Sequence, residues 1–407
     1  MEYSIIKPDP RLQGEISLPA SKSISNRLLI IQALSSKEFR ITNLSDSDDT
    51  RVLENALQGD GKIIDIGHAG TSMRFLTAYL SITEGERVLT GSERMKDRPI
   101  GELVAALREL GADIRYLEKN GYPPLMIRGR KLKGGRLVID SSLSSQFISA
   151  LLMIAPVLDE GLQLRLTGHT VSSAYINLTL KLMESFGISY RWSGDQITIR
   201  AQEYRPCDTA VEADWSAASY WYEMAALAEE PDLLIRGLSS RSLQGDSVLS
   251  EICKDFGIHT EYLHHGIKIT GSFRPVARYN HNFSDHPDLV QTFTVLCCLR
   301  NIPFRFAGTE TLRVKETDRI MALAQELSKF DIRIRSSGDG RGIDFDGRSP
   351  LKVGRVSIDT YQDHRMAMSF APAAMLGYRL DIQDPDVVSK SYPGYWEDLR
   401  SVGFEII

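Results

Sequence analysis

The chain has 407 residues, of which 42% are hydrophobic and 25% charged, a composition typical of a globular protein with about two domains. Acidic residues outnumber basic ones, 53 to 48, which argues against a general nucleic-acid-binding surface, so any anion site must be local. No apolar run approaches the ~20 residues of a membrane span, and Met1 to Pro10 lack the apolar region of a signal peptide. We therefore expect a cytoplasmic protein with no membrane partner.

The first elements in chain order are two predicted strands. Residues 3–6 and 15–18 alternate between apolar and polar side chains, with a proline-containing turn between them. Next comes a polar, basic turn at residues 21–27, which leads into the apolar helix pattern of residues 28–34. The unsatisfied N–H groups and the dipole of that helix would add to the charges of Lys22 and Arg27, an arrangement that binds anions. A plain capped helix with solvated cations is the alternative.

This polar turn before an apolar helix recurs along the chain. Five further copies begin near Gly70, Ser144, Asp214, Asp285 and Asp363. They alternate with six helix ends at Gly or Asp that pass into a β-branched stretch, near residues 59, 111, 187, 257, 331 and 403. Two interleaved six-fold patterns indicate one α/β unit of about 68 residues repeated six times.

Between these helix starts the chain supplies further polar groups. Residues 67–71 form a glycine turn, a weak signal for a phosphate loop, and Arg98 stands just before Pro99 at another helix start. Ser144 and Ser172 open the helix patterns that follow two alternating strands. Hydroxyl caps are common in helices of every function, so these serines alone do not indicate a site.

The distribution of the repeats predicts two domains. Three helix starts fall between Ser21 and Glu212 and three follow, whereas the first two strands lack a unit of their own. We expect those strands to join the C-terminal half. The predicted domains are residues 1–20 plus 214–407 and residues 21–213, joined by two short crossings that form a hinge.

Several cations lie at helix starts or tight turns: Lys22, Arg27, Arg98, Lys315, Arg319, Arg365 and Lys390. If the two halves face each other, these charges meet in one cleft, which is unfavourable unless a substrate rich in phosphate and carboxylate neutralises them. Asp288 and Glu316 belong to the same set of helix starts and are the candidates for proton transfer. A solvated helix face would equally explain the charge run at residues 313–319.

No metal-ligand spacing is visible, and the four cysteines do not provide one. Cys297 and Cys298 stand in an apolar run, so we expect buried, reduced thiols. A nucleotide loop of the G-x-x-x-x-G-K-[ST] type is also absent from the sequence. We therefore expect phosphate to be held by side chains and backbone N–H groups, without a metal or cofactor.

Six motifs together resemble those of the 3-phosphoshikimate 1-carboxyvinyltransferase (EPSP synthase) family of enolpyruvyl transferases. They lie at residues 21–27, 69–74, 98–101, 144–147, 314–319 and 363–368, from one end of the chain to the other. The resemblance implies transfer of the enolpyruvyl group of phosphoenolpyruvate to the 5-hydroxyl of shikimate 3-phosphate, in the route to chorismate and aromatic amino acids. It also implies two inverse α/β barrel domains, each of three βαβαββ units, that close over the substrates.

The resemblance further implies roles for individual residues. The shikimate 3-phosphate set is Lys22, Ser23, Arg27, Ser144, Ser145, Gln146, Ser172, Tyr175, Asp288, Thr311 and Lys315. The phosphoenolpyruvate set is Lys22, Gly70, Arg98, Gln146, Arg319, Arg365 and Lys390. In the catalytic set, Asp288 accepts the proton of the attacking hydroxyl and Glu316, helped by Lys315, delivers one to the methylene carbon, with Lys22 as the fourth member.

The chain departs from the usual family pattern at a few positions. His68 stands where Asn is usual, Phe75 where Pro is common, Thr311 where Asn often contacts the shikimate phosphate, and Gln362 where Asn is frequent. Residues 51–67 are also short, as if one unit had lost part of its helix and strand. These changes concern local substrate contacts and leave the proton-transfer residues in place.

Two alternative functions stay open from the sequence. The sister transferase that acts on UDP-N-acetylglucosamine usually has a reactive cysteine in its first half, whereas no cysteine precedes Cys207 here. A non-catalytic protein that binds anions or RNA ends could use the same repeats, but Asp288 and Glu316 argue for catalysis, and the sequence lacks an aromatic-rich basic face. We take a monomer as the default.

Overall fold

The computed structural model describes residues 1–142, 144–338 and 340–407, and the chain divides into two compact units. Unit 1 consists of residues 1–20 and 212–407, and unit 2 of residues 21–211. The chain passes from one unit to the other twice, after Ala20 and after Val211. Among the described residues, no helix is long and apolar enough to cross a membrane.

The elements of unit 1 form three repeats. In chain order they are β1 (Glu2–Ile6), β2 (Gln13–Ser17), α8 (Trp215–Leu227), β13 (Asp232–Arg236), η2 (Gly245–Val248), α9 (Leu249–Ile252), η3 (Cys253–Phe256), β14 (Ile258–Leu263), β15 (Gly266–Gly271), β16 (Tyr279–Asn282), η4 (Pro287–Leu289), α10 (Val290–Leu299), β17 (Phe304–Ala307), η5 (Glu310–Val314), α11 (Arg319–Ser328), β18 (Arg335–Ser336), β19 (Gly342–Phe345), β20 (Arg355–Ile358), α12 (His364–Phe370), η6 (Ala371–Leu376), β21 (Arg379–Gln383), η7 (Pro385–Lys390), α13 (Tyr395–Ser401) and β22 (Glu405–Ile406).

Each repeat of unit 1 contributes one four-stranded sheet with the same order. The sheets run β2-β13-β15-β14, β16-β17-β19-β18 and β20-β21-β1-β22, so in each the first two strands are parallel and the others antiparallel. The two N-terminal strands complete this pattern. β2 pairs in register with β13, and β1 lies between β21 and β22, in the third place of its sheet.

Unit 2 repeats the same scheme. Its elements are α1 (Lys22–Leu34), β3 (Ile41–Thr42), α2 (Asp48–Gln58), β4 (Ile63–Asp65), α3 (Gly70–Ile82), β5 (Gly85–Thr90), α4 (Glu93–Lys96), α5 (Gly101–Glu109), β6 (Asp113–Tyr116), β7 (Leu125–Gly129), β8 (Gly135–Asp140), α6 (Ser145–Ile154), η1 (Ala155–Val157), β9 (Leu162–Thr167), α7 (Ser173–Ser185), β10 (Tyr190–Ser193), β11 (Gln196–Ile199) and β12 (Thr209–Ala210).

One repeat of unit 2, the one that contains α1 and α2, has a reduced sheet. Two sheets, β4-β5-β7-β6 and β8-β9-β11-β10, have the same order as those of unit 1, but β3 and β12 form only a two-stranded parallel sheet. This short pair belongs to the repeat that contains α1 and α2. This agrees with the short stretch at residues 51–67 in the sequence, because among the described residues this repeat has no further strands to extend its sheet.

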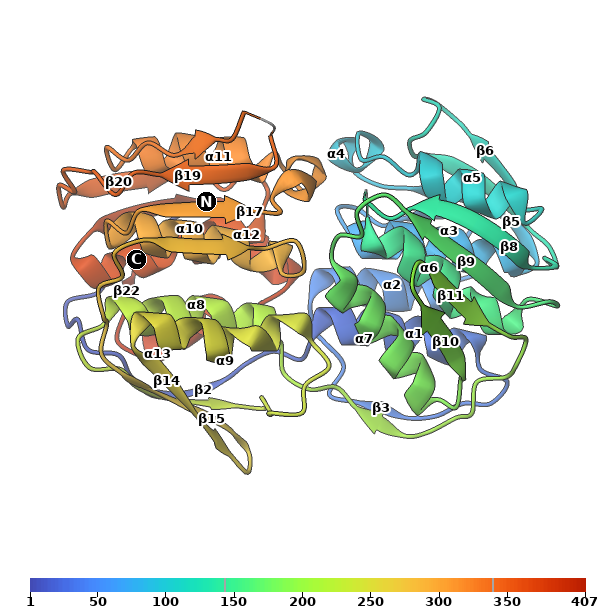
Figure 1. Ribbon diagram of the computed structural model, residues 1–407, viewed down its shortest axis with the longest axis horizontal. Coiled ribbons are helices and arrows are strands. Elements are labelled where there is room, and N and C mark those ends of the chain that lie inside the picture. The colour runs from blue at the N-terminus through green and yellow to red at the C-terminus, as the bar shows by residue number, and fades with distance from the viewer. Residues whose placement is uncertain (143, 339) are drawn as a thin grey trace. The chain divides into compact units, whose positions relative to one another are not determined.

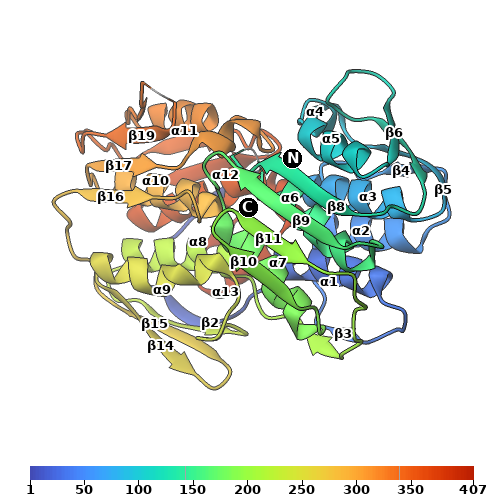
Figure 2. The same cartoon turned by 45° about the vertical axis from the view of Figure 1, so that its right-hand side comes forward.

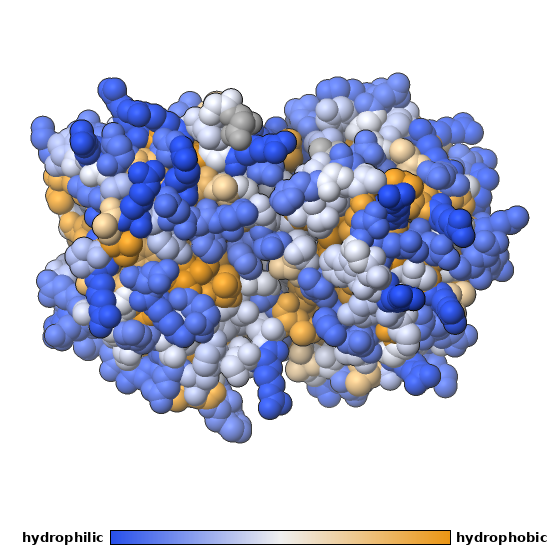
Figure 3. Space-filling view, viewed as in Figure 1, coloured by the Kyte–Doolittle hydropathy of each residue, from blue (hydrophilic) through white to orange (hydrophobic). Residues whose placement is uncertain are grey.

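Buried helices form the centre of each unit, and the sheets lie outside them in both views (Figures 1 and 2). α6, α8, α10 and α12 are buried along almost their whole length, whereas the strands alternate between buried and exposed side chains. Helices inside and sheets outside are the inverse α/β arrangement that the resemblance implies. The face seen in Figure 3 is mostly hydrophilic, with apolar patches between the polar side chains.

Short polar residues fix the starts of several buried helices. Asp214 caps α8 by accepting hydrogen bonds from the N–H groups of Ser216 (2.8 Å) and Ala217 (3.1 Å). Asp363 caps α12 in the same way, and Ser144 caps α6. Each such cap contributes about 1 kcal/mol and fixes where the first turn begins, so the polar groups of that turn are held in place.

The predicted cysteine chemistry is confirmed. All four cysteines are free, and Cys297 and Cys298 are buried in α10. Burial raises the pKa of both thiols well above the usual value, so neither ionises near neutral pH. These thiols therefore serve as small apolar groups in the core of unit 1.

Candidate active site

Arg319 is the centre of a group of charges in unit 1. Its Nε and Nη2 donate to the two carboxylate oxygens of Asp363, at 2.7 and 3.3 Å. Its Nη1 donates to Asp288 (3.1 Å) and its Nη2 to Glu316 (3.0 Å). Arg319 begins α11, directly after the cap residue Asp318, and its side chain is only 2% exposed. One guanidinium thus links three carboxylates from three different segments of the chain.

Arg365, in the first turn of α12, provides the second cation. Its Nη2 lies 2.9 Å from Asp288 Oδ2, and its Nη1 donates to the Tyr220 hydroxyl and to the Asp288 carbonyl, both at 3.2 Å. Lys315 Nζ lies 4.0 Å from Asp288 Oδ1. Asp288 is therefore surrounded by cations that come from helix starts and turns elsewhere in unit 1.

Glu316 occupies a similar position. One of its oxygens accepts from Arg319, and the other lies 3.1 Å from Lys390 Nζ. The side chains of Glu316 and Lys390 are 12% and 8% exposed, so the pair is mostly shielded from solvent. The structure thus brings together every predicted proton-transfer and phosphoenolpyruvate residue that belongs to unit 1.

These ion pairs determine the protonation of Asp288. Burial alone would raise its pKa, but the charges of its cationic neighbours, Arg365 foremost, outweigh burial and hold the pKa well below the usual value of an aspartate. Burial lowers the pKa of Arg319, but the three carboxylates raise it by more, so the net shift is upward. Both groups are therefore fully ionised at neutral pH in the absence of another anion.

In unit 2, the starts of four helices are linked by short contacts. Lys22 Nζ, at the start of α1, lies 3.2 Å from Asp49 Oδ2 in α2. The Asp49 carbonyl accepts from Ser72 Oγ of α3 at 3.2 Å, and Gln146 Nε2 of α6 donates to Thr71 Oγ1 of α3 at 3.1 Å. The predicted residues Lys22, Gly70 and Gln146 are thereby gathered around the first turn of α3.

Arg98 packs against that same turn. A Cβ added to Gly70 would lie 2.4 Å from Arg98 Nη1, so a larger residue here would displace the guanidinium from its present position. Arg74 fixes the neighbouring chain, because its Nη2 donates to the Pro99 carbonyl (2.7 Å) and its Nη1 to the Gly70 carbonyl (3.3 Å). Arg98 is buried, 5% exposed.

Comparison with known proteins identifies the family. The sequence model of EPSP synthase (3-phosphoshikimate 1-carboxyvinyltransferase) matches residues 6–62 and 54–399. A protein of that name from Bacteroides fragilis is 51% identical over 407 residues, covering 100% of this chain and 99% of its own length. Another from a Sulfurovum species is 38% identical and covers 99% of both chains. This chain belongs to the EPSP synthase family.

The family assignment confirms the predicted enzyme class and the predicted fold. An EPSP synthase structure from Acinetobacter baumannii matches 100% of this chain and 99% of its own with a TM-score of 0.79, at 22% sequence identity. The two matched segments of the family model overlap at residues 54–62, within the stretch that the sequence analysis identified as short. The abbreviated repeat is thus visible both in the match and in the two-stranded sheet.

Arg27 differs from the cations of unit 1, because its hydrogen-bond acceptors are neutral oxygens. Its Nε donates to Thr179 Oγ1 (2.7 Å) and its Nη1 to the Ser23 carbonyl (2.9 Å). Its Nη2 donates to Ser149 Oγ (3.3 Å) and to the Tyr175 carbonyl (3.4 Å). Burial lowers its pKa to about 10, so it is still a cation at neutral pH. No carboxylate of the described residues pairs with it.

The positions at which this EPSP synthase family member departs from the usual pattern have distinct local surroundings. The Phe75 ring lies 5.4 Å from the Arg27 guanidinium carbon, a cation–π contact. His68 Nδ1 lies 3.0 Å from Ser92 Oγ. Thr311 Oγ1 is buried and has no hydrogen-bond partner among the described residues. Gln362 adopts a left-handed backbone conformation, with φ of 57°.

The predicted hydroxyl residues of unit 2 lie at three helix starts, with Ser23 in the first turn of α1 and the others at the starts of α6 and α7. Ser144 Oγ accepts from the Gln146 N–H at 3.2 Å, and Ser145 is buried in the first turn of α6. Ser172 precedes α7 in a left-handed conformation, with φ of 56°, and its side chain does not cap the helix. The Tyr175 ring, in the first turn of α7, lies 5.9 Å from the Arg27 guanidinium carbon. The start of α7 is therefore next to Arg27.

Sequence reasoning missed residues that hold the site together. Asp363 pairs with Arg319, and Asp49 pairs with Lys22, yet neither was assigned a role. Both stand at helix starts in the sequence, so an acidic residue at such a start was the available signal. Tyr220, which contacts Arg365, lies within an apolar helix pattern that gives no such signal.

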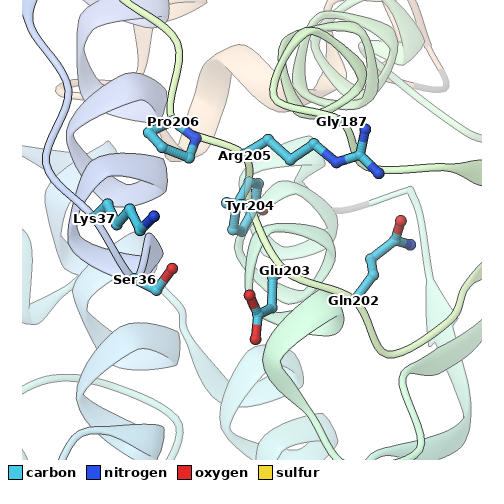
Figure 4. Close-up of a pocket in the computed structure, with 8 residues that line it drawn as sticks. All are labelled: Ser36, Lys37, Gly187, Gln202, Glu203, Tyr204, Arg205 and Pro206. Atoms are coloured by element: carbon cyan, nitrogen blue, oxygen red, sulfur yellow. The ribbon is translucent and has the colours of Figure 1, made fainter.

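Unit 2 also contains a pocket of about 390 Å³ away from these groups. Figure 4 shows the chain after α1, with Ser36 and Lys37, facing the extended segment 202–206. None of the predicted substrate or catalytic residues lines it. We therefore place the candidate active site at the helix starts and not in this pocket.

Proposed function

We propose that this chain transfers the enolpyruvyl group of phosphoenolpyruvate to the 5-hydroxyl of shikimate 3-phosphate, releasing inorganic phosphate. The full-length match to the EPSP synthase family supports this activity, and the observation that carries it here is the Asp288–Arg319–Glu316 cluster. In that cluster, two carboxylates suited to proton transfer share one guanidinium. Cations that can bind a phosphate group and a carboxylate group surround these two side chains.

The proposed reaction begins when the substrate anions reach the cations of unit 1. Arg319, Arg365 and Lys390 are neutralised by Asp288 and Glu316. An arriving phosphate and carboxylate compete for the same N–H groups and weaken those ion pairs. Because the cations hold the pKa of Asp288 down, their engagement by substrate raises it and makes the carboxylate a better base.

Proton transfer then follows in two stages. Once the substrate anions have engaged Arg319 and Lys390, Glu316 takes up a proton and, assisted by Lys315, delivers it to the methylene carbon. Positive charge develops on C2, which the 5-hydroxyl attacks while Asp288 accepts its proton. The tetrahedral adduct breaks its C–O bond to phosphate, which leaves with the proton held by Asp288, and Glu316 takes back one methyl proton as the double bond forms again. Holding two reactants together can remove roughly 7–11 kcal/mol of barrier, so most of the site serves to position them.

We propose that the Arg27 region of unit 2 binds the phosphate group of shikimate 3-phosphate. Arg27 is a buried cation that no described carboxylate neutralises, and unit 2 also holds the hydroxyl-bearing helix starts at Ser144 and Ser172. Such an uncompensated charge favours an anionic ligand. Lys22 and Arg98 complete the cationic set of this unit.

We also propose that the active site forms where the two predicted domains, residues 1–20 plus 214–407 and residues 21–213, meet. The reason is chemical, because unit 1 supplies Asp288 and Glu316 whereas unit 2 supplies Arg27 and the hydroxyl groups. Substrates bound by both would draw the domains together. Small-angle scattering should show a smaller radius of gyration with both substrates, and an unchanged radius would contradict closure.

Compartment and assembly complete the proposal. Free thiols at all four cysteines fit a reducing compartment, so we place the enzyme in the cytoplasm. We propose a monomer, because each proposed role is filled by residues of a single chain. Sedimentation at several concentrations tests this, and a stable dimer would contradict it.

The activity is tested by measuring phosphate release from phosphoenolpyruvate with the purified chain. Shikimate 3-phosphate and UDP-N-acetylglucosamine are offered in separate reactions. We expect release only with shikimate 3-phosphate. Release only with the sugar nucleotide would replace the proposed function by that of the sister transferase.

A further inference from the structure

Unit 1 contains a second buried carboxyl group near Asp288 that the proposed reaction does not use. Asp246 lies in the first turn of η2 and its side chain is 4% exposed. Its Oδ2 accepts from Ser216 Oγ of α8 at 2.5 Å. Its Oδ1 is buried and has no hydrogen-bond partner among the described residues. A buried oxygen without a partner costs about 1–3 kcal/mol, so a compensating interaction is expected.

A nearby imidazole nitrogen likewise has no hydrogen-bond partner among the described residues. His286 Nδ1 lies 3.9 Å from Asp246 Oδ1, is buried, and makes no hydrogen bond to the described residues. The separation is about one ångström longer than a hydrogen bond, which a small side-chain rotation closes. Two such atoms repel if neither carries a proton and bind if one does. A single shared proton therefore satisfies both.

His286 connects this pair to the reaction. It precedes η4 and lies two residues before Asp288. Two hydrogen bonds close this turn: the His286 N–H donates to the Phe283 carbonyl (2.9 Å), and the Leu289 N–H donates to the His286 carbonyl (3.0 Å). Ser216 connects the other end to α8. A hydrogen bond between Asp246 and His286 would thus tie the Asp288 turn to a buried helix.

The surroundings favour a neutral pair. Burial and the charge of Asp288 raise the pKa of Asp246 to about 7, whereas burial lowers that of His286. The other groups that act on these two side chains come from several elements: Asp214 and Ser216 at the start of α8, Arg365 of α12, Asp285 in the loop and His281 of β16. An ionised Asp246 would add negative charge beside Asp288 and close to Arg365.

We propose that Asp246 shares one proton with His286, and that this neutral pair ties the Asp288 turn to α8 and keeps a second negative charge away from Arg365. Asp246 is then a positioning residue. The inference rests on the proposed function, since Arg365 is assigned to phosphoenolpyruvate there. Ionisation of Asp246 would weaken the binding of that anion without removing any contact to it.

The test compares Asp246→Asn, Asp246→Ala and the wild-type enzyme in steady-state kinetics from about pH 6 to about pH 8. An asparagine amide can donate to His286 Nδ1 as the protonated carboxyl does, but it cannot ionise. The measured quantity is the ratio of the wild-type KM for phosphoenolpyruvate to the KM of Asp246→Asn. We expect this ratio to rise about threefold or more as the pH increases across this range. Substrate ionisation affects both enzymes alike and cancels in the ratio.

The alanine variant separates positioning from charge. It removes the donor to His286, so we expect its kcat at about pH 6 to fall tenfold or more, whereas Asp246→Asn stays within about threefold of the wild type. Asp285→Asn removes a nearby charge and leaves the pair intact, so the wild-type KM divided by that of Asp285→Asn should not change with pH. Thermal unfolding shows that each variant is folded.

Two results would overturn the inference: a wild-type to Asp246→Asn KM ratio that does not change with pH, or an asparagine variant as impaired as the alanine variant. Either can occur in an enzyme that turns over shikimate 3-phosphate normally. A wild-type chain without that turnover would instead defeat the proposed function. The two failures are therefore distinguishable in the same set of measurements.

Discussion

Arg319 and Arg365 of unit 1 and Arg27 of unit 2 have different kinds of partner. In unit 1, Arg319 and Arg365 are bound to carboxylates of the same unit, with Asp288 shared between them. In unit 2, Arg27 is buried among hydroxyl and carbonyl oxygens and no described carboxylate pairs with it. We expect the first kind of cation to exchange one anion for another when substrate binds, and the second to gain its first anionic partner.

This difference explains why both kinds of site suit one reaction. A cation with internal counter-ions can change the proton affinity of those carboxylates when a ligand arrives, which serves acid–base chemistry. A cation held by neutral acceptors contributes attraction and position alone. We therefore assign chemistry to unit 1 and substrate retention to Arg27 and its neighbours.

Asp288→Asn should have the largest effect, because it removes the proposed base and an internal counter-ion together. We expect kcat to fall by a factor of about 10²–10⁴ while phosphoenolpyruvate binds more tightly, since Arg319 and Arg365 lose a competing anion. Stopped assays for turnover and fluorescence titration for binding measure the two effects. Asp318→Asn, which removes a carboxylate that pairs with Arg313 outside the cluster, is the control. Weaker binding in Asp288→Asn would contradict the competition.

Arg319→Met and Arg27→Met test the comparison through stability. The first leaves three carboxylates without their shared cation and should lower the free energy of unfolding by about 3–5 kcal/mol. The second leaves no carboxylate without a partner and should lower the free energy of unfolding by less. It should also raise the KM for shikimate 3-phosphate by about 10- to 100-fold, because charge-assisted hydrogen bonds are lost. Urea unfolding and steady-state kinetics measure these changes. Equal losses of stability would show that the two environments are equivalent.

Gly70→Ala tests how closely unit 2 is packed around its cations. The added methyl group would lie 2.4 Å from Arg98 Nη1, so the guanidinium must move. A displacement of about one ångström can lower the reaction rate by up to about 100-fold. We expect the KM for phosphoenolpyruvate to rise, while the KM for shikimate 3-phosphate changes little. Gly394→Ala is the control, because its added methyl group meets nothing within 4 Å and its φ is not positive. An unchanged KM in Gly70→Ala would place Arg98 outside the site.

Glu223 gives the smallest expected effect and sharpens the comparison within unit 1. It is a buried carboxyl group of α8 whose two oxygens have no hydrogen-bond partner among the described residues. Burial raises its pKa well above the usual 4.5, in contrast to Asp288 with its cations. Glu223→Met should stabilise the fold by about 1–3 kcal/mol by removing this unsatisfied group.

The pH dependence of that gain follows from the sign of the shift. The folded state holds the Glu223 proton while the unfolded state releases it above pH 4.5, so wild-type stability is lost as pH rises from there towards the folded-state pKa. The advantage of Glu223→Met should therefore grow with pH in this interval. Thermal unfolding at several pH values measures it, and a gain that shrinks with rising pH would contradict the assignment.

Much of the fold follows from local sequence patterns, because short polar caps before apolar helices and glycine ends are local signals. Asp214, Ser144 and Asp363 cap helices where the pattern predicts helix starts. The two-stranded sheet of β3 and β12 could not be predicted in this way, since its strands are far apart in the sequence and each has two residues.

The candidate site was predictable in its residue types but not in its pairing. Lys22, Arg319 and Arg365 stand at recognisable helix starts, whereas their partners come from other helix starts along the chain. Asp288 lies 31 residues from Arg319 in the sequence, and Asp363 lies 44 residues from it. Such contacts depend on how the helices pack. The pairing of Asp246 with His286 belongs to the same class.

We propose that cations of both units bind one pair of substrates beside Asp288 and Glu316. A crystal structure of Asp288→Asn with phosphoenolpyruvate and shikimate 3-phosphate tests it most directly. We expect phosphoenolpyruvate in contact with Lys22, Arg98, Arg319, Arg365 and Lys390, and the phosphate or carboxylate of shikimate 3-phosphate near Arg27. Substrates bound to one unit alone, with the substituted side chain at position 288 distant from the 5-hydroxyl, would contradict it.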